Sequence, residues 1–154
     1  MKSGIIFNNR VLDVIFIAWA LAQGYKVLTE VVTKKKLDFS TIWGTGGMPS
    51  SHSSTVTSLA TSVGLINGFN SLEFAIAVTF TGIVMYDAAG IRRAAGKQAG
   101  IINRLLEKIH HSPYLTGVQE EKLKELLGHT PLEVLVGGIL GIAVAFLMKL
   151  YLLG

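Results

Sequence analysis

Residues 131–153 constrain the fold more than any other part of the sequence. Within them, residues 134–148 include no charged or strongly polar side chain, so a helix here would have no face suited to water. A helix of roughly 20 mostly apolar residues is long enough to cross the hydrocarbon layer of a membrane. This run therefore predicts a membrane-spanning helix, and it argues against the competing interpretation of a soluble all-helical core.

Three further apolar runs, residues 11–32, 49–69 and 72–91, extend this pattern. Charged residues make up only 16% of the 154-residue chain, fewer than in a typical soluble domain. We predict an all-α integral-membrane bundle of four transmembrane helices, forming a single domain over residues 1–154. Basic residues before the first run would also suit a signal peptide, but Asp13 lies within that run, so we expect a retained helix.

The connection between the third and fourth runs, residues 94–127, has a different character. Its first part, residues 94–110, would place apolar side chains on one face of a helix and polar side chains on the other. It is too short and too charged to span a membrane, which is typical of an interfacial amphipathic helix lying on the surface. Ser112 and Pro113 end this helix, and a short polar helix over about residues 118–127 follows.

Composition excludes several kinds of site. The chain has no cysteine, so it forms no disulfide and no thiolate metal site. Its net charge of +4 is modest, and the basic residues form no stripe suited to nucleic acid. His110 and His111 are adjacent, and adjacent side chains on a helix diverge. We therefore expect no metal, no cofactor and no nucleic-acid partner.

Residues 46–54 read Gly-Gly-Met-Pro-Ser-Ser-His-Ser-Ser and lead from a polar loop into the second apolar run. Pro49 suits the first position of a helix. Ser50, Ser51 and His52 then fall in the first turn, where backbone N–H groups have no helical partner. Such a helix start binds anions, phosphate above all. The alternative is an ordinary capped helix start that contains a chance histidine.

Residues 128–133 form another helix start. Thr130 as the cap, Pro131 at the first helical position and Glu133 at the third match a capping box. His129 and Glu133 are four residues apart, so the carboxylate could also hold one ring nitrogen of His129. That contact would fix the tautomer and leave the other nitrogen free to attack a phosphorus atom.

Ionisable residues also stand at the ends of the other runs. Lys26 is either a phosphate ligand or a lysine that extends along apolar surface to reach water. Asp87, Arg92 and Arg93 end the third run, where charges near a membrane helix suggest function. Arginine suits phosphate, although Arg93 could equally hold the helix on one side. Asp87 and Arg92 are five residues apart, an awkward spacing for a pair on an α-helix, so we expect Asp87 to orient another group.

Topology would bring these residues together. With four crossings, the end of the first helix, the start of the second, the end of the third and the start of the fourth share one membrane face. Two histidines, cations and two carboxylates suit phosphoryl transfer, with one histidine as nucleophile and the other as general acid. Cations would hold the charged oxygens. The residues at these ends are Lys26, His52, Asp87, Arg92, His129 and Glu133.

Three blocks of sequence carry a resemblance to a known family. Residues 48–53, Met-Pro-Ser-Ser-His-Ser, resemble the Pro-Ser-Gly-His motif of the type 2 phosphatidic acid phosphatase superfamily, which includes vanadium haloperoxidases. Residues 46–53, 87–99 and 127–133, taken in order, resemble more closely a divergent bacterial branch of that superfamily.

The resemblance implies roles for the matching residues. His129 would be the nucleophile that becomes phosphohistidine, His52 would protonate the leaving group, and Glu133 would orient His129 in place of the usual aspartate. Ser51 replaces the motif glycine, and the family's Arg-Pro and Ser-Arg pairs are missing. The expected catalytic residues are His129, His52, Glu133 and Asp87, and the expected phosphate ligands are Lys26, Ser50, Ser51, Arg92 and Arg93.

These observations predict a multi-pass membrane phosphatase that hydrolyses a lipid phosphate or diphosphate without a metal. Basic residues on the side of the site, such as Lys34–Lys36, predict a site facing the cytoplasm by the positive-inside rule. The alternatives are a non-catalytic lipid-headgroup binder or small lipid transporter that retains the anion site, and a structural membrane subunit. Expected partners are a phosphorylated lipid, membrane lipids and, through close packing at Gly137 and Gly141, a second copy of the chain.

Overall fold

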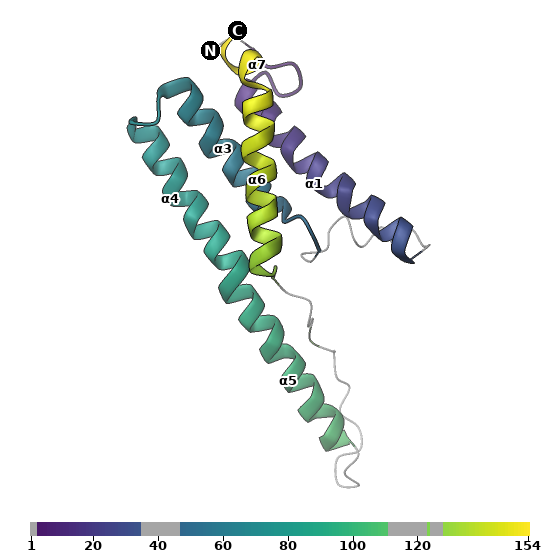
Figure 1. Ribbon diagram of the computed structural model, residues 1–154. Helices are drawn as coiled ribbons and strands as arrows, with labels where there is room; N and C mark the ends of the chain where they lie inside the picture. The colour runs from purple at the N-terminus through teal and green to yellow at the C-terminus, as the bar shows by residue number, and fades with distance from the viewer. Residues whose placement is uncertain (1–2, 35–46, 111–122, 124–127) are drawn as a thin grey trace.

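A computed structural model describes residues 3–34, 47–110, 123 and 128–154, and these residues form helices and no strand (Figure 1). The long connections that we predicted to hold Lys35, Lys36 and a short polar helix lie outside the described residues, apart from Leu123. The elements are α1 (Arg10–Lys34), α3 (Ser51–Asn67), α4 (Leu72–Tyr86), the π-helical turn η1 (Asp87–Ile91), α5 (Arg92–His110), α6 (Pro131–Leu147) and α7 (Lys149–Leu153).

Helix α3 is the centre of the bundle, in contact with α1, α4 and α6 (Figure 1). Many of its hydroxyl residues are buried, and two of them donate to carbonyls of neighbouring helices. The Ser54 hydroxyl donates to the Ala18 carbonyl of α1 at 3.0 Å, and the Thr57 hydroxyl donates to the Gly138 carbonyl of α6 at 3.0 Å. Ser54 and Thr57 therefore serve packing, as small and hydroxyl residues do between membrane helices.

Helices α3 and α6 approach so closely that glycine is required on α6. A Cβ atom at Gly141 would lie 2.2 Å from the Ser54 carbonyl oxygen, and one at Gly137 would lie 2.3 Å from that of Ser50. We expected Gly137 and Gly141 to admit a second copy of the chain. Helix α3 of the same chain covers this face, and contact with a second copy stays a prediction.

The end of the bundle near the chain termini holds an apolar core and a polar cluster. Val14 and Ala18 of α1 pack with Val144 and Ala145 of α6. Beside them the buried Asp13 carboxylate accepts hydrogen bonds from the backbone N–H groups of residues 5–7 and from the Tyr151 hydroxyl. The folded-back residues 3–9 bring these amides to Asp13, so this end of the bundle holds a polar set of its own.

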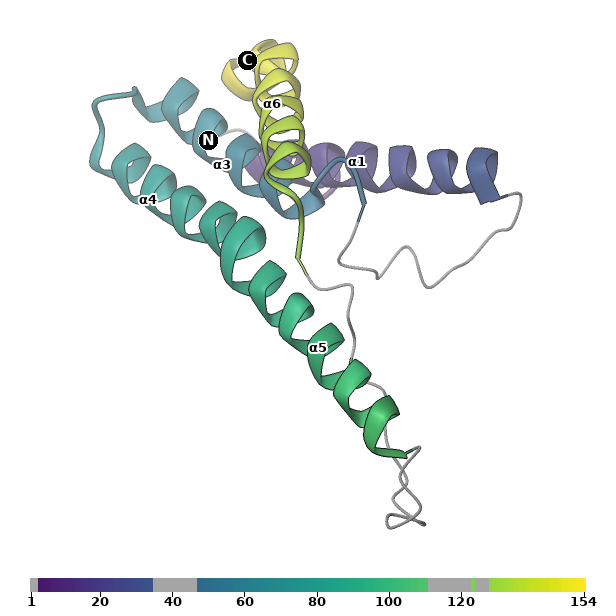
Figure 2. The same ribbon diagram turned by 60° about the horizontal axis from the view of Figure 1, so that its bottom comes forward.

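Helices α4 and α5 form one continuous rod, which extends beyond the other helices (Figures 1 and 2). We predicted a separate interfacial helix beginning near residue 94. Instead, η1 joins the two helices without a break, and the Arg92 N–H bonds to the Asp87 carbonyl. No proline interrupts the backbone hydrogen bonds here, which is why the rod continues.

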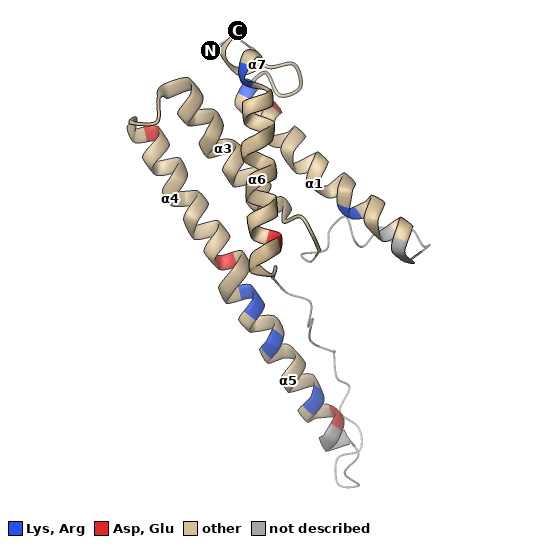
Figure 3. Cartoon of the chain, viewed as in Figure 1, with Lys and Arg blue, Asp and Glu red and all other residues tan. Residues whose placement is uncertain are grey.

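Charged residues lie at two levels of the bundle, near the chain termini and near the junction of α4 and α5, and they continue along α5 (Figure 3). Between these levels α3 carries none, α4 carries none after Glu73, and α6 carries none after Glu133. The segments Arg10–Thr29 and Leu72–Glu107 are long and apolar enough to cross a membrane, and Pro131–Leu147 is a shorter apolar helix. With 17 residues each, α3 and α6 fall below the roughly 20 of a full span. Four complete crossings therefore remain a prediction.

Candidate active site

A cavity of about 630 Å³ lies at the level of charge furthest from the termini. Helices α1, α3 and α4, the turn η1 and residues 128–129 surround it. Its polar lining includes Gln23, Ser51, His52, Asp87, Arg92 and His129, and its apolar lining includes Trp19, Val56, Phe80, Ile83 and Val84. The cavity thus combines a polar, charged part with an apolar part.

His129 is held in place by backbone contacts with η1 and the start of α5. Its N–H donates to the Ala88 carbonyl at 2.9 Å. Gly128 before it has a φ of +84°, and a Cβ there would lie 2.4 Å from the Arg93 backbone nitrogen. Glycine therefore allows the chain to pass directly over this helix, and the His129 side chain is left only 2% exposed.

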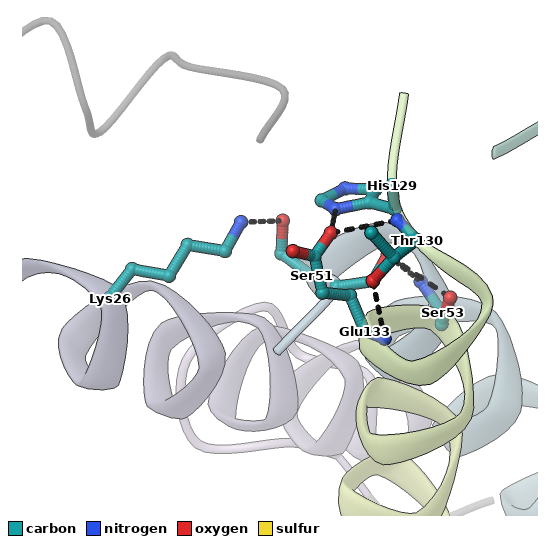
Figure 4. Close-up of polar contacts among 7 residues, drawn as sticks. Lys26, Ser51, Ser53, His129, Thr130 and Glu133 are labelled. Atoms are coloured by element: carbon teal, nitrogen blue, oxygen red, sulfur yellow. Dashed lines mark hydrogen bonds and ion pairs between the residues drawn. The ribbon is translucent and has the colours of Figure 1, made fainter. Parts of the chain in front are cut away.

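The capping box predicted for α6 is confirmed, and it also holds the histidine (Figure 4). The Glu133 Oε2 atom accepts from the Thr130 N–H at 2.9 Å and lies 3.2 Å from His129 Nδ1. The His129 Nε2 atom is buried and has no hydrogen-bond partner among the described residues. With Nδ1–H donating to the carboxylate, Nε2 carries the free lone pair of the neutral ring.

Burial lowers the pKa of His129 below its ordinary value, because the charged ring would lose hydration. The positive charge of Lys26 lowers it further, while the bond to Glu133 opposes both effects. The net direction favours the neutral ring, the form that can act as a nucleophile.

His52 lies in the first turn of α3, opposite His129. The two ring centroids are 6.1 Å apart, with the ring planes at 60°. The His52 side chain is exposed, whereas that of His129 is buried. Reacting atoms approach to about 3–3.5 Å, and protons transfer over about 2.6–3.2 Å. Both histidines line the cavity, so one ligand there can contact both rings.

The two serines before His52 have different surroundings. Ser50 is the N-cap of α3, and its buried hydroxyl accepts from the Ser53 N–H and hydroxyl. Pro49 accordingly precedes the cap and does not begin the helix. Because Ser50 does not line the cavity, the structure does not bring this expected phosphate ligand to the site. Ser51 does line the cavity, and its hydroxyl lies 3.4 Å from the Lys26 Nζ atom (Figure 4).

Lys26 points into the protein. Its side chain is only 4% exposed, so it does not extend outward to water as the alternative interpretation supposed. It reaches the cavity through Ser51 and adds positive charge beside His129. This placement suits a group that stabilises an anion.

Asp87 and Arg92 form a direct ion pair, with 2.5 Å between Arg92 Nε and Asp87 Oδ2. We expected this spacing to be awkward for a direct pair and Asp87 to orient another group, but the two side chains do pair. In a π-helix the backbone bonds join residues five apart, so the turn η1 aligns the two side chains where an α-helix would not. Both residues line the cavity.

Arg93 does not line the cavity, so Arg92 is the arginine that the fold brings to the site. Gln23 and Trp19 line it, although neither was among the expected site residues. Gln23 could have been found, because it precedes Lys26 by three residues and shares its helix face.

Residues 7–144 match the sequence model of a family described as the divergent PAP2 family. The chain belongs to this family. The resemblance to the phosphatidic acid phosphatase superfamily is thereby confirmed. The chain is also 42% identical, over 138 residues, to a protein of Bacillus subtilis (strain 168) named "Uncharacterized membrane protein YuiD". The match covers 84% of this chain and 87% of that protein, which supports a membrane location here. No solved structure matches the chain significantly.

Proposed function

We propose that this divergent PAP2 protein is a membrane phosphatase that hydrolyses a lipid phosphate or diphosphate through a phosphohistidine intermediate. Family membership supports a phosphatase-like membrane protein. One observation carries the finer proposal. The His129 Nδ1 atom contacts Glu133, its buried Nε2 atom has no partner in the part of the chain that the structure describes, and the His52 ring lies nearby.

In the first step the lone pair of His129 Nε2 attacks phosphorus, and the bond from phosphorus to the leaving oxygen breaks. Protonated His52 donates its proton to that oxygen. In the second step His52 takes a proton from water, the water oxygen attacks phosphorus, and the phosphorus–nitrogen bond breaks. Inorganic phosphate leaves and His129 is neutral again.

The charged residues have matching roles in this scheme. Glu133 stabilises the positive charge that develops on His129 in the attack. Lys26, Ser51 and Arg92 would hold the phosphoryl oxygens, whose negative charge such donors stabilise most strongly in a site that excludes water. The apolar part of the cavity would receive the first part of a lipid chain, and we place the site at the cytoplasmic face of a multi-pass protein.

The experiment is a phosphate-release screen over lipid phosphates and diphosphates with purified protein, with and without vanadate. We expect vanadate to inhibit release, and we expect His129→Ala and His52→Ala to abolish it. Asn70→Ala, in the exposed turn between α3 and α4, is the matched control and keeps full activity. Full activity in His129→Ala would reject the assigned nucleophile.

A second candidate is a lipid-headgroup binder without turnover. The missing Arg-Pro and Ser-Arg pairs favour it, because the chain departs there from the motifs of the catalytic superfamily that it resembles. It predicts that wild-type protein binds a lipid phosphate without releasing phosphate, and that His52→Ala changes affinity only.

A further inference from the structure

We propose that Asp87 is a positioning residue that acts through Arg92, and that the π-helical turn η1 is the device that presents Arg92 to the anion. The proposal rests on the proposed function for the nature of the anion, a phosphoryl group. It assigns Asp87 a different role from that of an acid or base acting on substrate.

The first support is the backbone. Residues 87–91 form a π-helical turn inside an otherwise continuous helical rod. π-Helices are rare, appear mostly as single turns inside α-helices, and are frequent at functional sites. Here the turn begins at one cavity-lining charged residue, Asp87, and ends directly before another, Arg92.

The second support is the contact between Asp87 and the guanidinium group of Arg92. Asp87 Oδ2 contacts Arg92 at Nε, on the side of the group. Neither terminal nitrogen of Arg92 has a partner among the described residues. Arginine presents its donors in a rigid planar fork, so fixing Nε fixes the direction of the two terminal nitrogens. That pair can bind two oxygens of one phosphoryl group.

The third support is the position of the pair. Arg92, His52 and His129 all line the same cavity. The turn η1 also accepts the His129 N–H at the Ala88 carbonyl, so one backbone element locates both the nucleophile and the arginine. Stability does not explain the pair, because the Arg92 and Asp87 side chains are 50% and 33% exposed and exposed ion pairs contribute little.

The test is a double-mutant cycle with Asp87→Asn, Arg92→Ala and the double variant, each as the full chain in detergent micelles. Orthovanadate affinity, measured by calorimetry, reports the oxyanion site without needing turnover, and phosphate release reports catalysis. Asn preserves the shape of Asp while removing its charge. Lys97→Ala, an exposed basic residue on α5 outside the cavity, is the matched control.

We expect Arg92→Ala to weaken vanadate binding by about 100-fold, as loss of one oxyanion donor does. Asp87→Asn should weaken it by about tenfold, as loss of an orienting partner does. The double variant should be no weaker than Arg92→Ala, because Asp87 acts only through that arginine. Arg92→Lys should not restore affinity, since lysine lacks the planar fork. Circular dichroism verifies that each variant is helical.

The two proposals fail differently. The positioning role would be overturned if the loss of vanadate affinity in the double variant equalled the product of the two single losses. Unchanged vanadate affinity in Asp87→Asn would also overturn it, even if the wild type releases phosphate. Wild-type protein that binds vanadate with the expected coupling but releases no phosphate would overturn the phosphatase and leave this inference standing. A wild type that does not bind vanadate would overturn both.

Discussion

Among single residues, Glu133 has two tasks that a substitution can separate. Its carboxylate caps α6 through Thr130 and holds His129. Glu133→Gln keeps an oxygen that can accept from the Thr130 N–H, so the free energy of unfolding should change by no more than about 0.5 kcal/mol. The turnover number should fall about 10- to 100-fold, because a neutral amide does not stabilise the charged ring. Thermal unfolding and phosphate release, measured together, check this.

Thr130→Ala is the matched control for that prediction. It removes the cap hydroxyl, which costs about 1 kcal/mol, yet it leaves the contact between Glu133 and His129. The free energy of unfolding should therefore fall, while the turnover number stays close to that of the wild type. If Glu133→Gln lowered the free energy of unfolding as much as Thr130→Ala does, the separation of the two tasks would be contradicted.

The protonation of His129 predicts the acid limb of the pH profile. Its lowered pKa keeps the ring neutral at pH values where an ordinary histidine is charged. Phosphate release should therefore fall only as the pH drops through a value below the ordinary histidine pKa of about 6.5. Lys26→Met removes a positive charge that lowers this pKa, so its acid limb should move to higher pH. A profile of kcat/KM against pH gives the midpoint of this fall even when the maximal rate of the variant is low. If Lys26→Met did not move the midpoint, the assignment of the fall to His129 would be contradicted.

At the scale of elements, the contact between α3 and α6 depends on glycine. Gly141→Ala would place a Cβ 2.2 Å from both the Ser54 carbonyl oxygen and the Thr57 hydroxyl. The helices must then separate, which should lower the free energy of unfolding by about 1–3 kcal/mol. Activity should fall as well, since the start of α6 holds His129. Ile139→Ala, on the exposed side of the same helix, is the control for thermal unfolding, and equal stability in both variants would contradict the close approach.

The rod formed by α4, η1 and α5 shows where local pattern is insufficient. The charges at residues 87–93 are the usual mark of a helix end, and the amphipathic residues after them are typical of a surface helix. Both features are present, yet the backbone continues through a π-helical turn. A π-helical turn has no side-chain signature that distinguishes it from an α-helical turn, so the pairing of Asp87 with Arg92 could not be predicted.

For the whole molecule, the crossing of the membrane is the property to measure. Asn70, in the turn between α3 and α4, and Lys97, on α5, lie at opposite ends of α4, and both are exposed. The chain has no cysteine, so Asn70→Cys and Lys97→Cys each provide a single labelling site. We expect an impermeant maleimide to label Asn70→Cys in intact cells and Lys97→Cys only after the membrane is opened. Labelling of both in intact cells would contradict a crossing at α4, and the reverse pattern would place the site outside.

The sequence by itself determined the features that depend on neighbouring residues. These are the helical class, the apolar runs and the capping box at residues 130–133, whose hydrogen bonds join residues three apart. Capping and helix periodicity act within one or two turns, so the local order of residues is sufficient. Family membership also followed from short motifs read in order.

Only the tertiary structure decided which side chains reach the cavity. It buried Ser50 as a cap, turned Lys26 inward to Ser51, left Arg93 outside the cavity and covered Gly137 and Gly141 with α3. It also joined Asp13 to Tyr151, 138 residues later in the chain. Such contacts depend on how closely whole helices approach and rotate, which is set by packing over the full bundle rather than by any local run of residues.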